Sequence, residues 1–193
     1  MRLIDITREL LGAPSYPGDE RPVLTQELSF EKEGYRLSSL RLCVHNGTHA
    51  DAPSHFLAAG RDVASMDPAL FVGPCVVRTV SGAVDGVTAL ELSLKGCEKL
   101  LLRGGALTEQ GAKVLLRRGV RTVGTDRLSI SHSEETEAAV HRALLEAGAA
   151  ILENLRLDDA PDGQYFLFAP PLLIAGAEGA PVRAMLLCET EEP

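Results

Sequence analysis

The chain has 193 residues, of which 45% are hydrophobic and 24% are charged, a composition typical of a globular protein with one sizeable core. Its formal net charge of −8 argues against a nucleic-acid or anionic-membrane partner, because both attract surfaces rich in Lys and Arg. The sequence also contains no apolar run near the roughly 20 residues needed to span a bilayer.

The N-terminus and the cysteines favour a cytoplasmic protein. The segment Met1–Asp5 reaches charged residues at once, which is unlike a secretory signal peptide. The four cysteines are far apart and form no C-x-x-C pair, so we expect reduced thiols and not a disulfide framework or a zinc knuckle. We therefore expect residues 1–193 to form a single cytoplasmic domain.

The N-terminal part of the chain predicts two strands separated by a long loop. Residues 3–7 alternate as a short strand does, and residues 12–37 contain several Gly and Pro among charges. The alternation of residues 38–45 predicts a second strand, which would place His45 at a strand end. Three aromatic residues of this region are candidates for a substrate pocket: Tyr16, Phe30 and Tyr35.

The segment His45–His55 holds three of the five histidines and one aspartate. Imidazole and carboxylate groups are the ligands that a divalent metal uses where no thiolate is offered. Gly47 gives the backbone the freedom to turn within the segment. A histidine-rich loop without a role is the weaker interpretation, because the chain is otherwise poor in histidine. The pattern therefore indicates a metal site.

The remainder of the chain predicts a mixture of strands and helices. We expect a loop with a short helix over 56–70, and a helical turn over 87–94. Two longer helices are predicted, one over 108–118 with Thr108 as its N-cap, and one from the capping box Ser131–Glu134 to about Ala147. The predicted strands are 74–80, 98–103, 120–124, 149–152, 165–168, 172–175 and 182–188. The fold class is therefore α/β or α+β with a mostly β core.

A single His-His-Asp trio leaves metal coordination incomplete, so further donors are required. His141 falls within a predicted helix, and Glu153 lies at the end of the strand that follows. This order can bring both side chains to one edge of the sheet. From the residues alone, a half-buried helix histidine and a solvated glutamate remain open as the alternative.

The segment His45–Phe56 matches the signature H-x-G-T-H-x-D-x-P-x-H-F, and with it the chain resembles the cyclase family of metal-dependent hydrolases. Bacterial kynurenine formamidase and isatin hydrolase belong to this family. The resemblance covers nearly the whole chain, including Pro17–Asp19, Gly119–Asp126 and Gly179–Ala184. It also includes His141 followed by Glu153 twelve residues later.

The resemblance implies a β-rich, swivelling β/β/α fold in which His45, His49 and Asp51 hold one metal ion. In members with two metals, Asp51 would bridge to a second ion held by His141 and Glu153. His55 would by the same resemblance be an acid/base beside the metals. Zinc or manganese is expected, with one or two ions per chain, and so is a homo-oligomer, either a dimer or a tetramer.

Such a site is suited to the hydrolysis of an amide-type bond. An open metal position lowers the pKa of bound water toward 7 and stabilises the anion formed on a carbonyl oxygen. We predict that metal-bound hydroxide attacks a small amide, such as an aryl formamide or a lactam, while His55 supplies the proton to the leaving nitrogen. Thr48 is a candidate to hydrogen-bond a ligand carboxylate, and Asp126 either supports the ligands or caps the next turn.

Two alternative functions remain open. A cyclase or dehydratase of the same family would use the same metal on a polyketide-like or hydroxy-acid compound. A metal- or small-ligand-binding protein without turnover belongs to a different class, and the presence of His55 with both predicted half-sites argues against it. Aromatic residues make up only 4% of the chain, with no Trp, so the particular small-molecule substrate is left unassigned.

Overall fold

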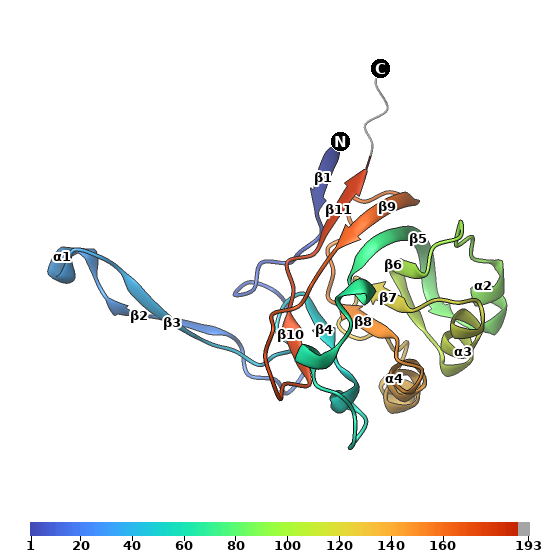
Figure 1. The fold of residues 1–193 in the computed structure, drawn as a ribbon, viewed down its shortest axis with the longest axis horizontal. Helices are drawn as coiled ribbons and strands as arrows, with labels where there is room; N and C mark the ends of the chain where they lie inside the picture. Colours follow the sequence, from blue (N-terminus) through green and yellow to red (C-terminus); the bar gives the residue numbers. More distant parts are fainter. Residues whose placement is uncertain (189–193) are drawn as a thin grey trace.

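A computed structural model describes residues 1–188, and its main body is built around one nine-stranded mixed sheet (Figure 1). The last five residues of the predicted domain 1–193 lie outside the described residues. The order of strands across the sheet is β1-β11-β9-β5-β6-β7-β8-β4-β10. In chain order the helices and strands are β1 (Arg2–Asp5), β2 (Val23–Leu28), α1 (Phe30–Glu33), β3 (Leu37–Arg41), β4 (His49–Asp51), β5 (Val72–Val84), α2 (Gly86–Glu91), β6 (Lys99–Leu107), α3 (Glu109–Arg117), β7 (Thr122–Thr125), α4 (Glu137–Glu146), β8 (Ala150–Glu153), β9 (Gly163–Phe168), β10 (Gly179–Pro181) and β11 (Met185–Cys188).

The centre of the sheet is parallel and both of its flanks are antiparallel. Strands β5, β6, β7 and β8 run parallel in that order, and each connection between them carries one helix. Parallel neighbours require such crossovers, and α2, α3 and α4 lie together beside the sheet (Figure 1). The predicted α/β class with a mostly β core is confirmed.

Two hydrophobic cores lie on the two faces of the sheet. Leu100 and Leu102 of β6 belong to the cluster that contains the buried residues of α3 and α4, whereas Leu101 belongs to the other cluster. On β8, Ile151 packs on the helix side and Leu152 on the opposite side. Glu153 is two residues beyond Ile151, so strand alternation directs it to the helix side. This orientation sets the position of the candidate site.

The two predicted longer helices are present, but only one begins as expected. Thr108 caps α3, since its hydroxyl oxygen accepts a hydrogen bond from the Gly111 N–H at 3.1 Å. The predicted capping box at 131–134 is wrong, because α4 begins at Glu137 after a 3₁₀ turn. The Ser131 hydroxyl donates to the Ser133 carbonyl at 2.9 Å and lies 3.1 Å from the Thr136 hydroxyl, so it does not cap the helix.

An arm formed by β2, α1 and β3 projects from the body of the molecule (Figure 1). Residues 12–37 were expected to be a loop, and that expectation is wrong for β2 and α1. The predicted strand 38–45 ends already at Arg41, so His45 lies in the turn beyond it. The arm has no core of its own, since every residue of β3 is exposed, and its apolar alternation therefore says nothing about burial.

Two short strands at the edge of the sheet differ from the expected structure. β4 and β10 both fall between the predicted strands, and they pair with each other. The predicted strand 172–175 is wrong, because that segment lies outside the strands and Leu173 is 84% exposed. β4 and β10 are each three residues long, which is too short to show periodicity in the sequence.

Within residues 1–188 no helix combines the length and the apolar character needed to cross a bilayer. All four cysteines are unpaired thiols.

Candidate metal centre

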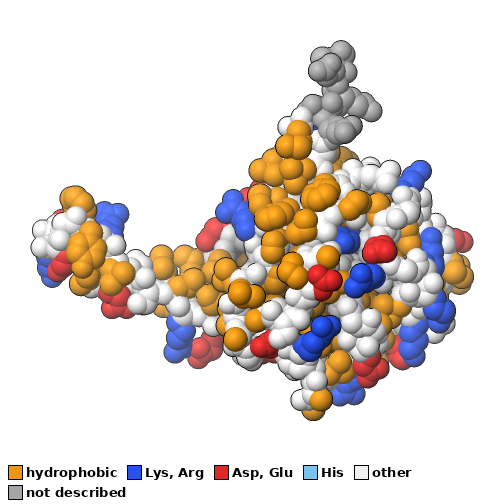
Figure 2. Space-filling view, viewed as in Figure 1, with side chains coloured by type: hydrophobic (Ala, Val, Ile, Leu, Met, Phe, Trp, Pro, Cys, Tyr) orange, Lys and Arg blue, Asp and Glu red, His pale blue; other side chains and the backbone are white. Residues whose placement is uncertain are grey.

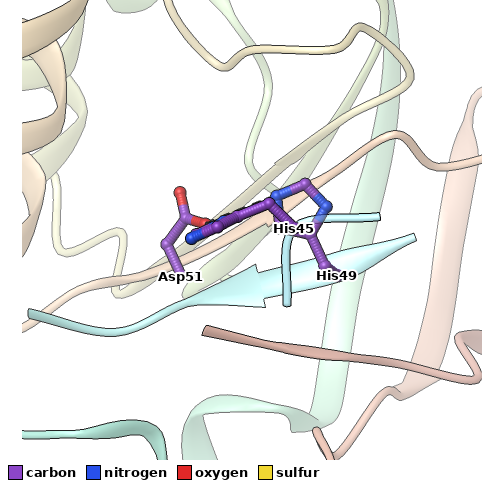
Figure 3. Close-up of side chains that lie close together, drawn as sticks. All are labelled: His45, His49 and Asp51. Carbon is purple, nitrogen blue, oxygen red and sulfur yellow. Dashed lines mark hydrogen bonds and ion pairs between the residues drawn. The ribbon is translucent and has the colours of Figure 1, made fainter. Parts of the chain in front are cut away.

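The pairing of β4 with β8 places three of the predicted ligands on one face of the sheet. His49 lies directly opposite Glu153 and Asp51 lies opposite Ile151. Residues separated by two positions point to the same side of a strand, so His49, Asp51 and Glu153 all face the helices. Figure 3 shows His49 and Asp51 rising from β4 with the ring of His45 beside them.

His45 reaches the cluster from the turn before β4, and two glycines make room for it. Gly47 has φ +66°, a left-handed conformation that glycine adopts without strain. A Cβ atom on Gly179 would lie 2.9 Å from His45 Cε1 and 2.9 Å from the Ala50 carbonyl oxygen. The His45 ring therefore lies over bare backbone of β10, within reach of Asp51.

Backbone carbonyls fix the tautomers of the two buried histidines. Nδ1 of His49 lies 3.0 Å from the Gly47 carbonyl oxygen, and Nδ1 of His141 lies 2.8 Å from that of Glu137. Because a carbonyl oxygen only accepts hydrogen bonds, each Nδ1 carries the proton and each Nε2 is free to bind a metal. Both Nε2 atoms face the carboxylates of Asp51 and Glu153.

The chain turns sharply after Glu153 and holds its carboxylate in place. The Ile130 N–H donates to Glu153 Oε1 at 2.6 Å. Asn154 adopts φ +56°, a left-handed conformation that asparagine tolerates better than most residues. Its buried side chain donates to the Pro14 carbonyl, which ties the N-terminal loop to the end of β8.

The donor atoms form two groups that share Asp51. The ligand atoms of His45, His49 and Asp51 all lie within 4.8 Å of one another, and so do those of Asp51, His141 and Glu153. The separations are 3.1 Å for His45 Nδ1–Asp51 Oδ1, 3.4 Å for His49 Nε2–Asp51 Oδ1, 3.5 Å for His49 Nε2–Glu153 Oε2, 3.2 Å for His141 Nε2–Glu153 Oε1 and 3.5 Å for His141 Nε2–Asp51 Oδ2. Asp51 is thus positioned to bridge two ions.

Burial and charge act in opposite directions on the histidines of the cluster. Burial lowers the pKa of His49 and of His141, but the carboxylates of Asp51 and Glu153 outweigh it and raise the pKa to about 10 and about 11, respectively. Both rings therefore carry protons at neutral pH when no ion is bound, and metal binding must release those protons.

Two buried atoms of the cluster have no hydrogen-bond partner within residues 1–188, namely His45 Nε2 and Asp51 Oδ2. An unsatisfied buried polar atom costs about 1–3 kcal/mol. A divalent cation would satisfy the Asp51 oxygen, and imidazole with carboxylate suits zinc or manganese. The residues present therefore fit the expected group.

His55 lies beside the donor cluster. Its ring centroid is 4.2 Å from that of His45 and 6.0 Å from that of His141. Burial is the main cause that lowers the pKa of His55, so the ring is neutral at pH 7 and able to accept a proton. Together with the donor histidines and Phe56, His55 lines a cavity of about 240 Å³.

Comparison with known proteins identifies the family of this chain. The model of the family described as "Putative cyclase" matches residues 4–132. A kynurenine formamidase from Bacillus cytotoxicus is 36% identical, over 95% of this chain and 96% of its own length. The chain belongs to the cyclase family.

Solved structures of other proteins share this fold. One described as a potential metal-dependent hydrolase with cyclase activity has a TM-score of 0.82 and 28% identity, covering 96% of both chains. Isatin hydrolase A from Labrenzia aggregata, at 21% identity, also has a TM-score of 0.82, covering 97% of this chain and 94% of its own. The mixed, sheet-dominated architecture expected from the resemblance is thus confirmed.

Of the three aromatic residues predicted to line a pocket, only Tyr16 lines the cavity. Its hydroxyl donates to Glu137 Oε2 at 2.9 Å, and burial together with this carboxylate raises its pKa to about 12, so it stays protonated. Phe30 and Tyr35 belong to the arm and are 61% and 55% exposed. The structure does not bring these two residues to the cavity of this chain, because the arm projects away from the body.

The two predicted supporting residues make other contacts. Thr48 donates from its hydroxyl to the Asn154 carbonyl at 2.7 Å and accepts from the Arg8 N–H at 2.9 Å, so it contacts no ligand carboxylate. Both carboxylate oxygens of Asp126 accept from the Gly104 N–H, which fastens the end of β7 to β6. The ligands are supported instead by backbone groups of Gly47, Ile130 and Glu137, which residue type alone does not reveal.

Proposed function

We propose that the chain is a metal-dependent hydrolase that cleaves the C–N bond of a small amide, with an aryl formamide such as N-formylkynurenine as a candidate substrate. The observation that carries the proposal is the largely buried set of three histidines and two carboxylates, with an unsatisfied Asp51 oxygen, beside a cavity that His55 also lines. The kynurenine formamidase relative supports the amide class.

His45, His49 and Asp51 would hold one ion, and Asp51, His141 and Glu153 a second, with zinc or manganese as the metal. When bound, such a cation supplies polarisation of the substrate carbonyl and activation of water. The Ile130 N–H donates to the Glu153 carboxylate, and this backbone contact orients Glu153 as a ligand.

His55 would move the proton. A neutral imidazole accepts a proton from the attacking water as the new C–O bond forms, and it returns that proton to the nitrogen as the C–N bond breaks. A formamide would then yield formate and the free amine. The lowered pKa of His55 suits the first transfer, because the ring must begin neutral.

The test of this role combines activity with metal content. His55→Ala is expected to lower kcat/KM for formanilide or N-formylkynurenine by about 10²–10⁴-fold while the metal per chain stays constant. Chelation of wild-type protein should abolish activity, and zinc or manganese should restore it. Loss of metal in His55→Ala would make His55 a ligand, and unchanged activity would refute its role.

We also propose that the chain forms a homo-oligomer through the arm. An isolated two-stranded hairpin is marginally stable in water, so β2 and β3 require a surface to pack on. Large apolar residues are exposed along the arm: Val23, Leu24, Phe30, Tyr35, Leu37 and Leu40. Figure 2 shows hydrophobic side chains along the arm and over the adjoining part of the body.

The four unpaired thiols favour a cytoplasmic location.

A further inference from the structure

A second hollow, the side groove, opens beside the metal cavity. Its volume is about 560 Å³, and four residues line both spaces: Tyr16, Leu128, Glu137 and Asn154. The metal cavity alone, at about 240 Å³, is smaller than the roughly 300–1,000 Å³ of most small-molecule sites. A substrate with its amide at the metals would therefore extend into the side groove.

The side groove carries two arginines with unused hydrogen-bonding capacity. Arg127 is exposed on its wall, and its guanidinium makes no hydrogen bond or ion pair with any residue in the range 1–188. Arg8 donates from Nη2 to the Asp126 carbonyl, but its buried Nε has no partner in the same range. These two cations stand out in a chain with a net charge of −8.

Three carboxylates also line the side groove, but none of them forms an ion pair with Arg127 or Arg8 within residues 1–188. Glu137 already accepts a hydrogen bond from the Tyr16 hydroxyl, and both oxygens of Asp126 are used by the Gly104 N–H. Glu134 is exposed on the same wall and is compatible with an ammonium group next to a bound anion. The guanidinium donors of Arg127 therefore remain free to bind a carboxylate.

The backbone of Arg127 is fixed relative to the metal ligands. Its N–H donates to Thr125 Oγ1 at 3.2 Å, and its carbonyl accepts from the Asn154 N–H at 2.8 Å. Asn154 directly follows Glu153, so Arg127 sits at a set spacing from the metal centre.

We propose that the side groove binds a carboxylate of the substrate, with Arg127 as its main cationic partner and Arg8 as the second. The inference rests on the proposed function and specifies it: the substrate is an amide that carries a carboxylate at the end remote from the scissile C–N bond. Arg127 is a specificity residue, because it contacts the substrate away from the reacting atoms.

The test uses two probes that differ only at the remote end. N-formylkynurenine carries an amino-acid group, and 2′-formamidoacetophenone has the same ring, ketone and formamide without it. Arg127→Gln is expected to raise KM for N-formylkynurenine about tenfold, with kcat and the kinetics of the neutral probe unchanged. Arg127→Lys should recover part of the loss. Arg142→Gln is the matched control, since Arg142 is exposed on α4 and does not line the side groove.

A binding measurement separates failure of this inference from failure of the proposed function. Calorimetric titration with kynurenine should show about tenfold weaker binding to Arg127→Gln than to the wild type. Equal binding, or an equal rise in KM for both probes, would overturn the carboxylate site. Absence of hydrolysis of either probe by the wild type would count against the proposed function, and the titration would still decide the role of Arg127.

Discussion

Asp51 is the residue on which both halves of the proposed metal centre depend. It is fully buried, and its two oxygens face His45 and His49 on one side and His141 on the other. Burial raises the pKa of Asp51, but the three histidines outweigh burial and hold the pKa well below its ordinary value. The carboxylate is therefore ionised and available to a cation at neutral pH.

Gly179 offers a residue-scale test of the His45 position. Gly179→Ala would place a Cβ 2.9 Å from both His45 Cε1 and the Ala50 carbonyl oxygen, so the ring or the edge strand must move. We expect the purified variant to lose the ion proposed at His45, measured by elemental mass spectrometry, and to unfold at a lower temperature.

Gly163→Ala is the matched control for that variant. Gly163 is also a strand glycine, and its Cβ would approach only the Tyr165 side chain, at 3.3 Å. The control should keep its full metal content. If Gly179→Ala kept its full metal content and activity, the position of the His45 ring would not require a glycine in β10.

At the scale of the elements, the register of β4 against β8 assembles the site. The sequence allowed His45, His49 and Asp51 to be predicted as donors, because histidines and a carboxylate at these spacings are chemically distinctive. His141 and Glu153 were added by the resemblance to the family. The sequence did not allow the pairing of His49 with Glu153 to be predicted, since β4 and β10 are too short to show periodicity. The carbonyl of Gly47 and the N–H of Ile130 were also missed, because every residue carries such groups.

The core strands and α3 were predictable because their apolar runs and periodic patterns reflect burial. The three leucines at 100–102 alternate between the two cores, and Thr108 caps α3. The arm was not predictable in this way, since its strands pair with each other and cover no core within the chain. Apolar patterns in a sequence predict burial, and few residues of the arm are buried.

An ion pair that joins β1 to the segment between β10 and β11 predicts a pH-dependent stability. Both Nε and Nη2 of Arg183 donate to Asp5 Oδ2, at 3.0 and 2.6 Å. Burial raises the pKa of Asp5, but the bonds from Arg183 and Thr7 outweigh it and leave the pKa below its ordinary value. A carboxyl group with a lowered pKa stabilises the fold above its unfolded-state pKa, and this stabilisation disappears as pH falls through the folded-state pKa.

Asp5→Asn should therefore lower the free energy of unfolding by about 1 kcal/mol at pH 7, a value limited by the solvent exposure of the pair. The difference from the wild type should shrink below pH 4 and vanish at lower pH. Urea unfolding at several pH values measures it. A difference that stays constant from pH 7 to pH 3 would show that the Asp5 charge is not its source.

At the scale of the whole molecule, the projecting arm predicts an assembly. Leu24 and Leu40 lie opposite each other on β2 and β3, and both are about half exposed. Sedimentation should give a multiple of the 20.6 kDa chain for the wild type and a smaller species for Leu24→Ser with Leu40→Ser. The control Val87→Ser with Leu90→Ser changes exposed apolar residues of α2 and should not alter the mass. A monomeric wild type at micromolar concentration would refute assembly through the arm.

The measurement that bears most directly on the central claim is the metal content per chain of untagged protein, compared with that of Glu153→Ala. The two groups of donor atoms share Asp51, so we predict about two zinc or manganese ions in the wild type and the loss of one in the variant. One ion in both proteins would confine the centre to His45, His49 and Asp51. No ion in either protein, even after reconstitution with zinc and manganese, would contradict the metal-dependent hydrolase.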